Sequence, residues 1–294
     1  MRPTPASPSD PETSRNAAPD VAPEVAPDAP RDAAAPVRLE VRQGYAVITL
    51  NRPEKLNSFN NLLHVQLRQA IAEAGAAPGV AAVLLTGAGR GFCAGQDLAE
   101  RDLRDGVPPP DLGDSLDRLY NPLIRQLRAL PKPVVCAVNG IAAGAGASLA
   151  LACDIVLAAR SASFIQAFCR IGLLPDSGAT WTLPRLVGDA RARALALLGE
   201  RISAQQAADW GMIWRCVEDE QLLAQAEALC SGFAAAPVRS LAAIKQALNA
   251  SAGNSLDAQL DLERDLQQQL GYSADYREGV QAFLGKRVPQ FKGC

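Results

Sequence analysis

Two short runs of uninterrupted apolar residues, Val80–Leu85 and Pro133–Val138, constrain the fold of this chain more than any other feature. A strand that is apolar at every position must be covered on both faces, as in a parallel sheet flanked by helices. The segment between the two runs repeats apolar residues at helical spacing, as at Leu119, Leu123 and Leu127. Strands that alternate with helices in this way predict an α/β fold with buried sheets.

The N-terminal end of the chain differs in composition from this α/β middle part. Residues 1–36 are dominated by Pro, Ala, Asp and Ser and contain almost no large apolar side chain. Such a segment buries too little apolar surface to offset the entropy of ordering, so we expect a disordered tail. Two β-prone runs follow, Arg38–Arg42 and Ala46–Leu50, and the Gln43-Gly44 pair between them predicts a hairpin.

The C-terminal part is predicted to be helical. From about Ser203 the strand signal fades, and apolar residues at helical spacing take its place. The predicted helices are Leu222–Cys230, Val238–Leu248, Ser255–Leu270 and Ala274–Leu284. We therefore expect a tail over residues 1–36, a core domain over residues 37–235 and a helical, partner-binding region over residues 236–294.

Composition and charge exclude several classes of function. The chain has 29 basic and 31 acidic residues, a net charge of −2, which gives no reason to expect nucleic acid or an anionic membrane as a partner. Its seven cysteines include no CxxC pair, which argues against a disulfide framework or a metal site and for a reducing cytoplasm. No stretch reaches the ~18 apolar residues of a membrane span. We expect a cytoplasmic protein without a metal.

Two glycine-rich loops follow the buried strands. Gly87–Leu98 has the sequence GAGRGFCAGQDL, and its four glycines allow positive φ and a close approach of the backbone to a ligand. Asn139–Ala147 leads into an Ala-rich helix whose small side chains leave the first backbone N–H groups uncovered. Tight packing of helix on sheet is an equally good interpretation of such turns. Motifs typical of nucleotide phosphate binding are absent from the sequence.

A third loop, Gly172–Gly178, places the carboxylate of Asp176 among Leu, Pro and Gly. Two interpretations are open for this residue. It precedes a predicted helix at Thr180–Val187 and fits a helix cap. An acid in apolar surroundings is also a candidate for proton transfer, because burial shifts its pKa.

Four spaced motifs resemble one known family. They are LNRPEKLNSF at 50–59, GFCAGQDL at 91–98, KPVVCAVNGIAAGAG at 132–146 and SADYREGVQAFLGKR at 273–287. Together they are similar to the crotonase (enoyl-CoA hydratase/isomerase) superfamily, over about Val37–Gly293. The resemblance implies a crotonase-type spiral of ββα units over residues 37–235 that binds acyl-CoA. It also implies a C-terminal helical trimerisation region, and hence a homotrimer or a dimer of trimers.

The same resemblance implies the site residues. The thioester oxygen is expected to accept hydrogen bonds from the backbone N–H groups of Gln96 and Ala145, and Lys55-Leu56-Asn57 is expected to hold the adenine of coenzyme A. Further implied contacts to substrate or coenzyme A are Ala94, Gly95, Asp97, Leu98, Gly144 and Lys286, the last from a neighbouring subunit. No cofactor is implied, because coenzyme A is part of the substrate. Each preorganised donor is typically worth about 3–4 kcal/mol of enolate stabilisation.

Departures from the family pattern narrow the expected reaction. Ser148 and Phe168 match the two glutamates of the hydratases, and neither can carry the proton that hydration needs. Asp176 matches the carboxylate of several isomerases, in which it is the acid/base, and that of chlorobenzoyl-CoA dehalogenases, in which it is a nucleophile. Ala179 stands where the family often has a second glycine, a change expected to alter this loop only slightly.

The overall pattern resembles the isomerases of phenylacetate catabolism. These convert ring-1,2-epoxyphenylacetyl-CoA to oxepin-CoA and also shift double bonds in enoyl-CoA. The alternatives are a Δ3,Δ2-enoyl-CoA isomerase or another crotonase-type enzyme of fatty or aromatic acyl-CoA degradation, and a catalytically silent homologue that binds acyl-CoA or RNA. Against RNA stands the lack of a basic stripe.

Three aromatic or titratable residues have simpler interpretations. His64, the one histidine, is interpreted as a surface or packing residue. Tyr120 and Trp181 are candidates for the acyl pocket, but their place on apolar helical stripes fits the core equally well.

Overall fold

The computed structural model describes residues 35–101 and 104–293. The predicted disordered tail over residues 1–36 therefore lies almost wholly outside the described residues. All that follows concerns the described part of the chain.

The predicted hairpin is confirmed. Strand β1 (Val37–Arg42) pairs antiparallel with β2 (Tyr45–Leu50), with Arg42 opposite Tyr45. Gly44 closes the turn with a φ of +86°, and a Cβ atom there would lie 2.2 Å from the Cβ of Ala234. Glycine is therefore required twice at this turn, for its φ and for its lack of a side chain.

The hairpin is the edge of a six-stranded sheet with the order β1-β2-β3-β5-β7-β10. From β2 onward all pairs in this sheet are parallel. The further strands are β3 (Ala82–Gly87), β5 (Val134–Val138), β7 (Ile155–Ala159) and β10 (Arg215–Val217). β5 is buried at every position, as its uninterrupted apolar sequence predicts.

A second sheet of four short strands has the order β4-β6-β8-β9. Its strands are β4 (Gly91–Cys93), β6 (Ile141–Ala143), β8 (Ser163–Ile165) and β9 (Arg201–Ser203). The pairs β3–β4, β5–β6 and β7–β8 each place one strand in each sheet, which is the repeating ββα pattern of the expected fold class. The α/β spiral is thus confirmed.

Two expectations about strands were wrong. The short strands β4 and β6 lie inside the two segments that we interpreted as loops, and β10 lies beyond Ser203, where we expected strands to have ended. Each has three residues, too few to show an alternating pattern in the sequence. Their pairing depends on neighbours that are far away along the chain.

Ten α-helices are described. They are α1 (Asn61–Ala76), α2 (Leu112–Ser115), α3 (Asn121–Ala129), α4 (Ala145–Leu151), α5 (Ala179–Leu198), α6 (Ala204–Asp209), α7 (Leu222–Ala234), α8 (Val238–Ser251), α9 (Leu256–Gly271) and α10 (Ala274–Leu284). A π-helical turn, Leu116–Tyr120, joins α2 to α3. α5 extends well beyond the predicted Thr180–Val187 because the chain kinks at Gly188 (φ 76°, ψ 163°) and then resumes the helix.

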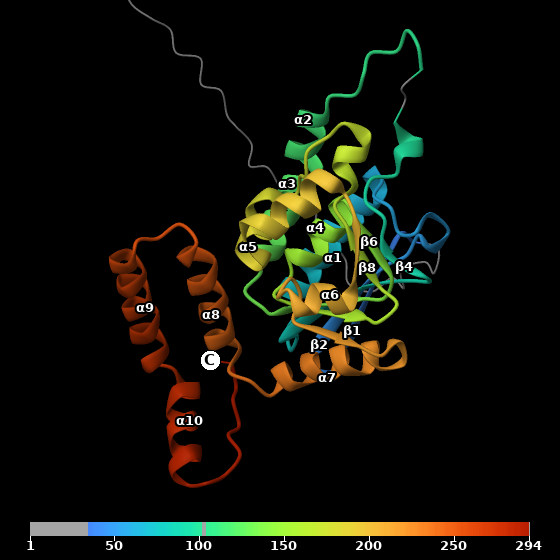
Figure 1. Ribbon diagram of the computed structural model, residues 1–294. Helices are drawn as coiled ribbons and strands as arrows, with labels where there is room; N and C mark the ends of the chain where they lie inside the picture. The colour runs from blue at the N-terminus through green and yellow to red at the C-terminus, as the bar shows by residue number, and fades with distance from the viewer. Residues whose placement is uncertain (1–34, 102–103, 294) are drawn as a thin grey trace, which may run out of the picture. The chain divides into compact units, whose positions relative to one another are not determined.

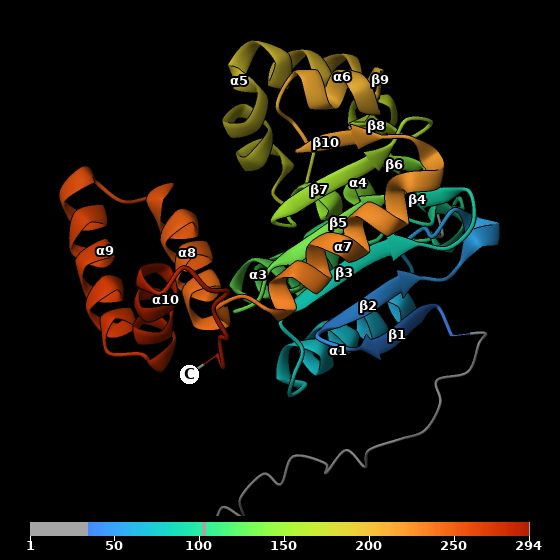
Figure 2. The same cartoon turned by 90° about the horizontal axis from the view of Figure 1, so that it is seen from below.

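The helices cover both faces of the six-stranded sheet. α7 crosses one face, in contact with β2, β3, β5 and β7, whereas α1 lies against β1 and β2 on the opposite face (Figures 1 and 2). The N-cap of α1 is Asn60, whose side chain accepts a hydrogen bond from the Leu63 N–H at 2.8 Å. In the described part of the chain, no helix combines the length and apolarity that crossing a membrane requires.

Helices α8, α9 and α10 form a C-terminal arm that begins directly after α7 (Figure 2). A buried cation anchors the arm to the core. The Nζ atom of Lys245 in α8 donates to the carbonyl oxygens of Leu127 at 3.0 Å and Lys132 at 3.2 Å, and pairs with Asp154 Oδ2 at 2.7 Å. Asp154 Oδ2 also accepts from the N–H of Val134 in β5. The arm is thus tied to the central strand of the sheet.

We predict that Lys245→Ala lowers the free energy of unfolding by about 2–3 kcal/mol, since it removes three hydrogen bonds of a charged donor at once. Arg239→Ala on the exposed side of the same helix is the matched control and should stay within about 0.5 kcal/mol of the wild type. Urea unfolding and limited proteolysis of the arm measure both effects. Equal stability of the two variants would contradict the anchoring role.

Candidate active site

The two glycine-rich loops meet with backbone against backbone. A Cβ atom at Gly146 would lie 2.1 Å from the Cys93 carbonyl oxygen. One at Gly95 would lie 2.8 Å from the Ala143 carbonyl oxygen and 3.5 Å from the Ala145 nitrogen. No side chain fits at either position. The tight-packing interpretation of these glycines is therefore correct, and the same packing brings Gln96 beside the start of α4.

At this contact two backbone donors have no hydrogen-bond partner among the described residues. The Phe59 N–H donates to the Gly95 oxygen at 2.7 Å, and the Asp97 N–H donates to the Phe59 oxygen at 2.9 Å. The Gln96 N–H between them points away from Phe59, and Ala145 is the first residue of α4. Among the described residues, neither the Gln96 nor the Ala145 N–H donates a hydrogen bond. Such donors can bind an oxygen that carries negative charge.

Asp176 lies against the same helix. Its carbonyl oxygen accepts a hydrogen bond from the Ser148 hydroxyl of α4 at 3.2 Å. Burial raises the pKa of its carboxyl group, and a hydrogen bond from the Ser177 hydroxyl, at 2.9 Å, partly offsets that effect. Hydrogen bonds lower the pKa of four other carboxyl groups, so the shift of Asp176 has the opposite direction to theirs. They are those of Glu40, Glu218, Asp219 and Glu278. A carboxylate of this kind suits the uptake and return of a proton.

The helix-cap interpretation of Asp176 is wrong. The N-cap of α5 is Gly178, and no side chain caps this helix. Asp176 contributes its carbonyl oxygen, which accepts from the buried first residue, Ala179, at 3.0 Å. Its carboxylate therefore does not cap α5.

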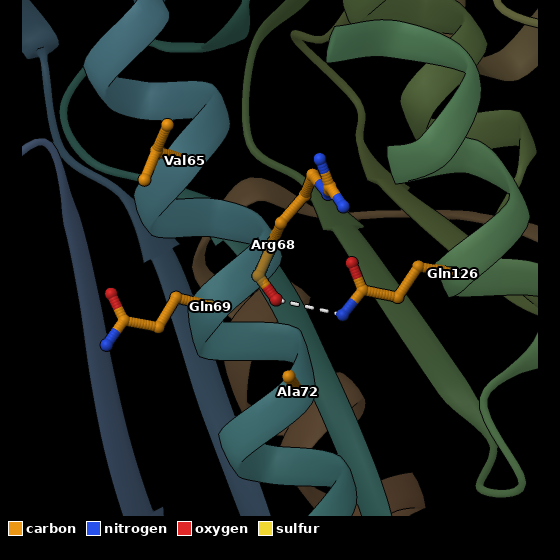
Figure 3. Close-up of a pocket in the computed structure, with 5 residues that line it drawn as sticks. All are labelled: Val65, Arg68, Gln69, Ala72 and Gln126. Atoms are coloured by element: carbon orange, nitrogen blue, oxygen red, sulfur yellow. Dashed lines mark hydrogen bonds between the residues drawn. The ribbon is translucent and has the colours of Figure 1, made fainter. Parts of the chain in front are cut away.

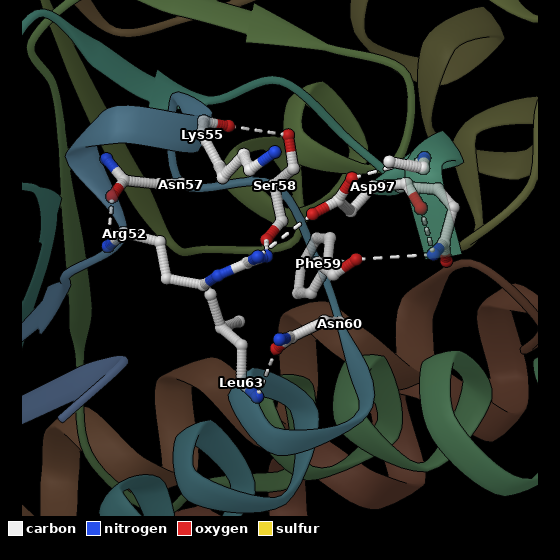
Figure 4. A network of polar contacts seen from close by, with 10 residues as sticks. Arg52, Lys55, Asn57, Ser58, Phe59, Asn60, Leu63 and Asp97 are labelled. Carbon is white, nitrogen blue, oxygen red and sulfur yellow. Dashed lines mark hydrogen bonds and ion pairs between the residues drawn. The ribbon is translucent and has the colours of Figure 1, made fainter. Parts of the chain in front are cut away.

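The segment around Arg52 braces the first loop (Figure 4). Arg52 forms an ion pair with Asp97 at 2.9 Å, with the two side chains only 13% and 9% exposed, and donates to the Ser58 oxygen at 2.6 Å. The Asn57 side chain is buried and bonds the backbone at three points, the Arg52 N–H and the oxygens of Ala88 and Gly91. Asp97 and Asn57 were predicted to contact the substrate or coenzyme A. Their side chains instead form hydrogen bonds and an ion pair that stabilise the first loop and the segment around Arg52.

The remaining predicted residues fall into two groups. Ala94 donates its N–H to the Leu56 oxygen at 3.0 Å, and exposed Lys55 precedes Leu56, so these lie together beside the first loop. Leu98 is exposed on the same loop, and Gly144 directly precedes α4. Lys286 is exposed and follows α10, the last helix of the C-terminal arm.

The structure decides between the alternatives for the aromatic residues. His64 is buried and its ring stacks on Phe59 at 4.5 Å, which confirms a packing role. Burial, aided by Arg68, lowers its pKa to about 4. Tyr120 is buried, and its hydroxyl donates to the Gln96 side chain at 2.6 Å, a contact that sequence spacing did not indicate. Trp181 is 40% exposed.

A separate surface pocket of about 430 Å³ lies between α1 and α3 (Figure 3). In it, Gln126 Nε2 donates to the Arg68 oxygen at 2.9 Å. The lining residues are Val65, Arg68, Gln69, Ala72 and Gln126, and none of them is a predicted site residue. Within the described ranges, no group of three or more His, Cys, Asp or Glu side chains is placed to hold a metal ion.

Comparison with known proteins decides the family. The family model described as enoyl-CoA hydratase/isomerase matches residues 40–294. The chain belongs to this family. It is 58% identical over 253 residues to the 1,2-epoxyphenylacetyl-CoA isomerase of Escherichia coli, covering 86% of this chain and 97% of that protein. It is 49% identical over 257 residues to a probable enoyl-CoA hydratase of Rhodobacter capsulatus, covering 87% and 98%.

A solved structure gives the same result for the fold. An enoyl-CoA hydratase/isomerase of Mycobacterium abscessus superposes with a TM-score of 0.83 at 39% identity. The match covers 88% of this chain and 100% of that one.

The two positions expected to match the hydratase glutamates are Ser148 and Phe168 in this chain, and neither has a carboxylate. The Ser148 hydroxyl is occupied by the oxygens of Gly144 and Asp176, both at 3.2 Å. Phe168 is buried, and its ring lies 3.6 Å from where a Cβ of Gly144 would stand. Neither side chain can take up or release a proton near neutral pH.

We predict that Ser177→Ala moves the acidic limb of the kcat/KM profile to higher pH. A base must be ionised to take a proton, so activity falls as the pH drops through the pKa of Asp176. Loss of the Ser177 hydrogen bond destabilises the carboxylate and raises that pKa.

Ser148→Ala is the control, because Ser148 bonds the Asp176 carbonyl oxygen and not its carboxylate, so its acidic limb should not move. An unchanged limb in Ser177→Ala would show that ionisation of Asp176 does not control the rate.

Proposed function

We propose that this protein is an acyl-CoA isomerase that converts ring-1,2-epoxyphenylacetyl-CoA to oxepin-CoA and shifts double bonds in enoyl-CoA. Its place would be phenylacetate catabolism in the cytoplasm, a compartment supported by six free cysteines in the described ranges. The similarity to the Escherichia coli isomerase over almost the whole of that protein supports the substrate. The proposal needs no cofactor, since coenzyme A enters with the substrate.

The mechanism assigns one role to each group. The N–H groups of Gln96 and Ala145 donate to the thioester oxygen, which becomes more negative as the enolate forms. The carboxylate of Asp176 removes a proton from the α-carbon, so the C–H electron pair passes into the enolate. The same carboxyl group returns the proton at another carbon of the conjugated system. For the epoxide, the bond between the two ring carbons that share the oxygen also breaks, and its electron pair enters the double bonds of the seven-membered oxepin ring. No atom is gained or lost, as an isomerisation requires.

The observation that carries this proposal is the partly buried carboxyl group of Asp176, whose pKa is raised and whose backbone is bonded to α4. The first N–H of that helix and the Gln96 N–H donate no hydrogen bond among the described residues. Asp176 is the acid with the raised pKa, and Asp97, the other carboxylate of these loops, is paired with Arg52. Water addition needs a second proton carrier, and Ser148 and Phe168 supply none.

For coenzyme A, we propose that the Lys55–Asn57 segment holds the adenine, through the exposed Lys55 and backbone groups. Ala94, Gly95, Asp97, Leu98 and Gly144 would shape the adjoining loops. Lys286 would reach the adenine end from a neighbouring subunit.

We further propose a homotrimer or a dimer of trimers, built through a region over residues 236–294 that follows a core over 37–235. The support is the apolar surface of the arm. Tyr276 is 58% exposed, Phe283 83% and Leu284 74%. Side chains of this size are seldom left in water together unless a partner covers them.

We predict that Asp176→Asn lowers kcat by about 10²–10⁴-fold, because the amide keeps the shape of the side chain but cannot accept the proton. Acyl-CoA affinity should change little, since the N–H donors are untouched. The variant should also lose exchange of substrate-analogue protons with deuterated water, followed by mass spectrometry. Near wild-type turnover and exchange would place the base elsewhere.

We predict that 2-enoyl-CoA hydration is negligible beside isomerisation. A panel of epoxyphenylacetyl-CoA, 3-enoyl-CoA and 2-enoyl-CoA, with products resolved by mass and ultraviolet absorption, measures this directly. Turnover of 3-enoyl-CoA alone would favour a Δ3,Δ2-enoyl-CoA isomerase. Binding without any turnover would favour a silent acyl-CoA-binding or RNA-binding homologue. Efficient formation of 3-hydroxyacyl-CoA would contradict the roles given to Ser148 and Phe168.

A further inference from the structure

The side-chain amide of Gln96 is fully engaged in hydrogen bonds. Its Nε2 atom donates to the carbonyl oxygens of Phe59 at 3.3 Å and Asp97 at 3.2 Å. Its Oε1 atom accepts from the Tyr120 hydroxyl at 2.6 Å and from the Arg101 guanidinium at 3.3 Å. Arginine only donates, so the atom that it shares with Tyr120 is the amide oxygen, and the tyrosine is a donor. A side chain held in this way cannot rotate without breaking several hydrogen bonds.

Tyr120 is itself firmly held. It ends the π-helical turn Leu116–Tyr120 and is 4% exposed. Its ring meets Phe59 edge to face at 5.4 Å and His64 at 4.3 Å. π-Turns inside helices occur frequently at functional sites, where they redirect a side chain. Here the turn and the aromatic packing fix the place of the phenol oxygen beside Gln96.

The charge of the proposed catalytic acid also acts on this phenol. Burial raises the pKa of Tyr120, and the negative charge of Asp176 raises it further. Tyr120 therefore keeps its proton at neutral pH and donates to Gln96 throughout the reaction. Its hydroxyl contacts the side chain of the residue that supplies one of the two N–H donors.

We propose that Tyr120 is a positioning residue for the oxyanion donor of Gln96. By holding the amide oxygen, its hydroxyl fixes the Gln96 backbone so that the N–H keeps its direction toward the thioester oxygen. The proposal rests on the proposed function of the Gln96 N–H. It adds a residue that does not touch the substrate oxygen but sets the geometry of the group that does.

Tyr120→Phe tests this role, because it removes one oxygen atom and keeps the ring packing. We expect kcat to fall about 10–100-fold, less than the about 10²–10³-fold loss typical of removing an oxyanion donor outright. KM and the melting temperature should change little. The matched control is Tyr45→Phe in β2, which removes another buried tyrosine hydroxyl, one that accepts from Arg42 at 3.3 Å. It should leave kcat unchanged.

A spectroscopic measurement separates positioning from a general structural role. Infrared difference spectra of bound phenylacetyl-CoA labelled with ¹³C at the thioester carbonyl report the hydrogen bonds on that oxygen. In the wild type and in Tyr45→Phe the carbonyl band should shift to lower frequency on binding. In Tyr120→Phe the shift should be smaller. Gln96→Met, which keeps the N–H but loses the amide, should reduce the shift similarly, and the double variant should add little.

A wild-type kcat and a wild-type carbonyl shift in Tyr120→Phe would overturn the proposal. Should this variant not fold, the carbonyl shift in Gln96→Met decides the question from the other side of the contact. The ligand is not turned over, so its spectrum is obtained whether or not the wild type isomerises the epoxide. A failure of the proposed reaction is thus distinguishable from a failure of the positioning role.

Discussion

The structure depends on one steric constraint, the contact of bare backbone with backbone where the two glycine-rich loops meet. At Gly95 and Gly146 a single methyl group would collide with a carbonyl oxygen of the opposite loop. Because nothing intervenes, β4 and β6 pair as neighbours, and the first turn of α4 begins directly beside the Gln96 peptide. The two unpaired N–H groups follow from this contact and not from any polar side chain.

This contact leaves local costs that the surrounding segments offset. A buried N–H without a partner, as at Ala145, costs roughly 1–3 kcal/mol. Leu56 and Asn57 take left-handed conformations that side chains disfavour. The Asn57 amide, the Arg52–Asp97 ion pair and the Phe59 bridge tie the loop down at separate points. Backbone strain that neighbouring contacts stabilise is typical of ligand-binding sites. A bound ligand would supply the acceptor that the unpaired N–H groups lack.

The sequence predicted the large elements of this fold and missed the small ones. Long apolar runs such as Val80–Leu85 directly predict buried strands. The family motifs predicted the order of the ββα units. The three-residue strands carry no periodic signal, so β10 was not expected. For the site, motif spacing pointed to Asp176 and Gln96, but the contact of Tyr120 with Gln96 was not visible. It depends on a π-turn, which changes the face that a residue presents without changing the apolar pattern.

Apolar surroundings raise the pKa values of both Asp176 and Tyr120, but the chemical consequences for the two groups are opposite. Burial raises the pKa of Asp176, which makes its carboxylate a stronger base and brings its ionisation closer to neutral pH. Burial and the charge of Asp176 raise the pKa of Tyr120, which keeps the phenol protonated and therefore a donor. Burial instead lowers the pKa of His64 to about 4, so its ring is neutral at neutral pH. The same burial thus strengthens Asp176 as a proton acceptor and keeps Tyr120 a donor. One proton carrier of this kind suits an isomerase better than a hydratase, which needs two.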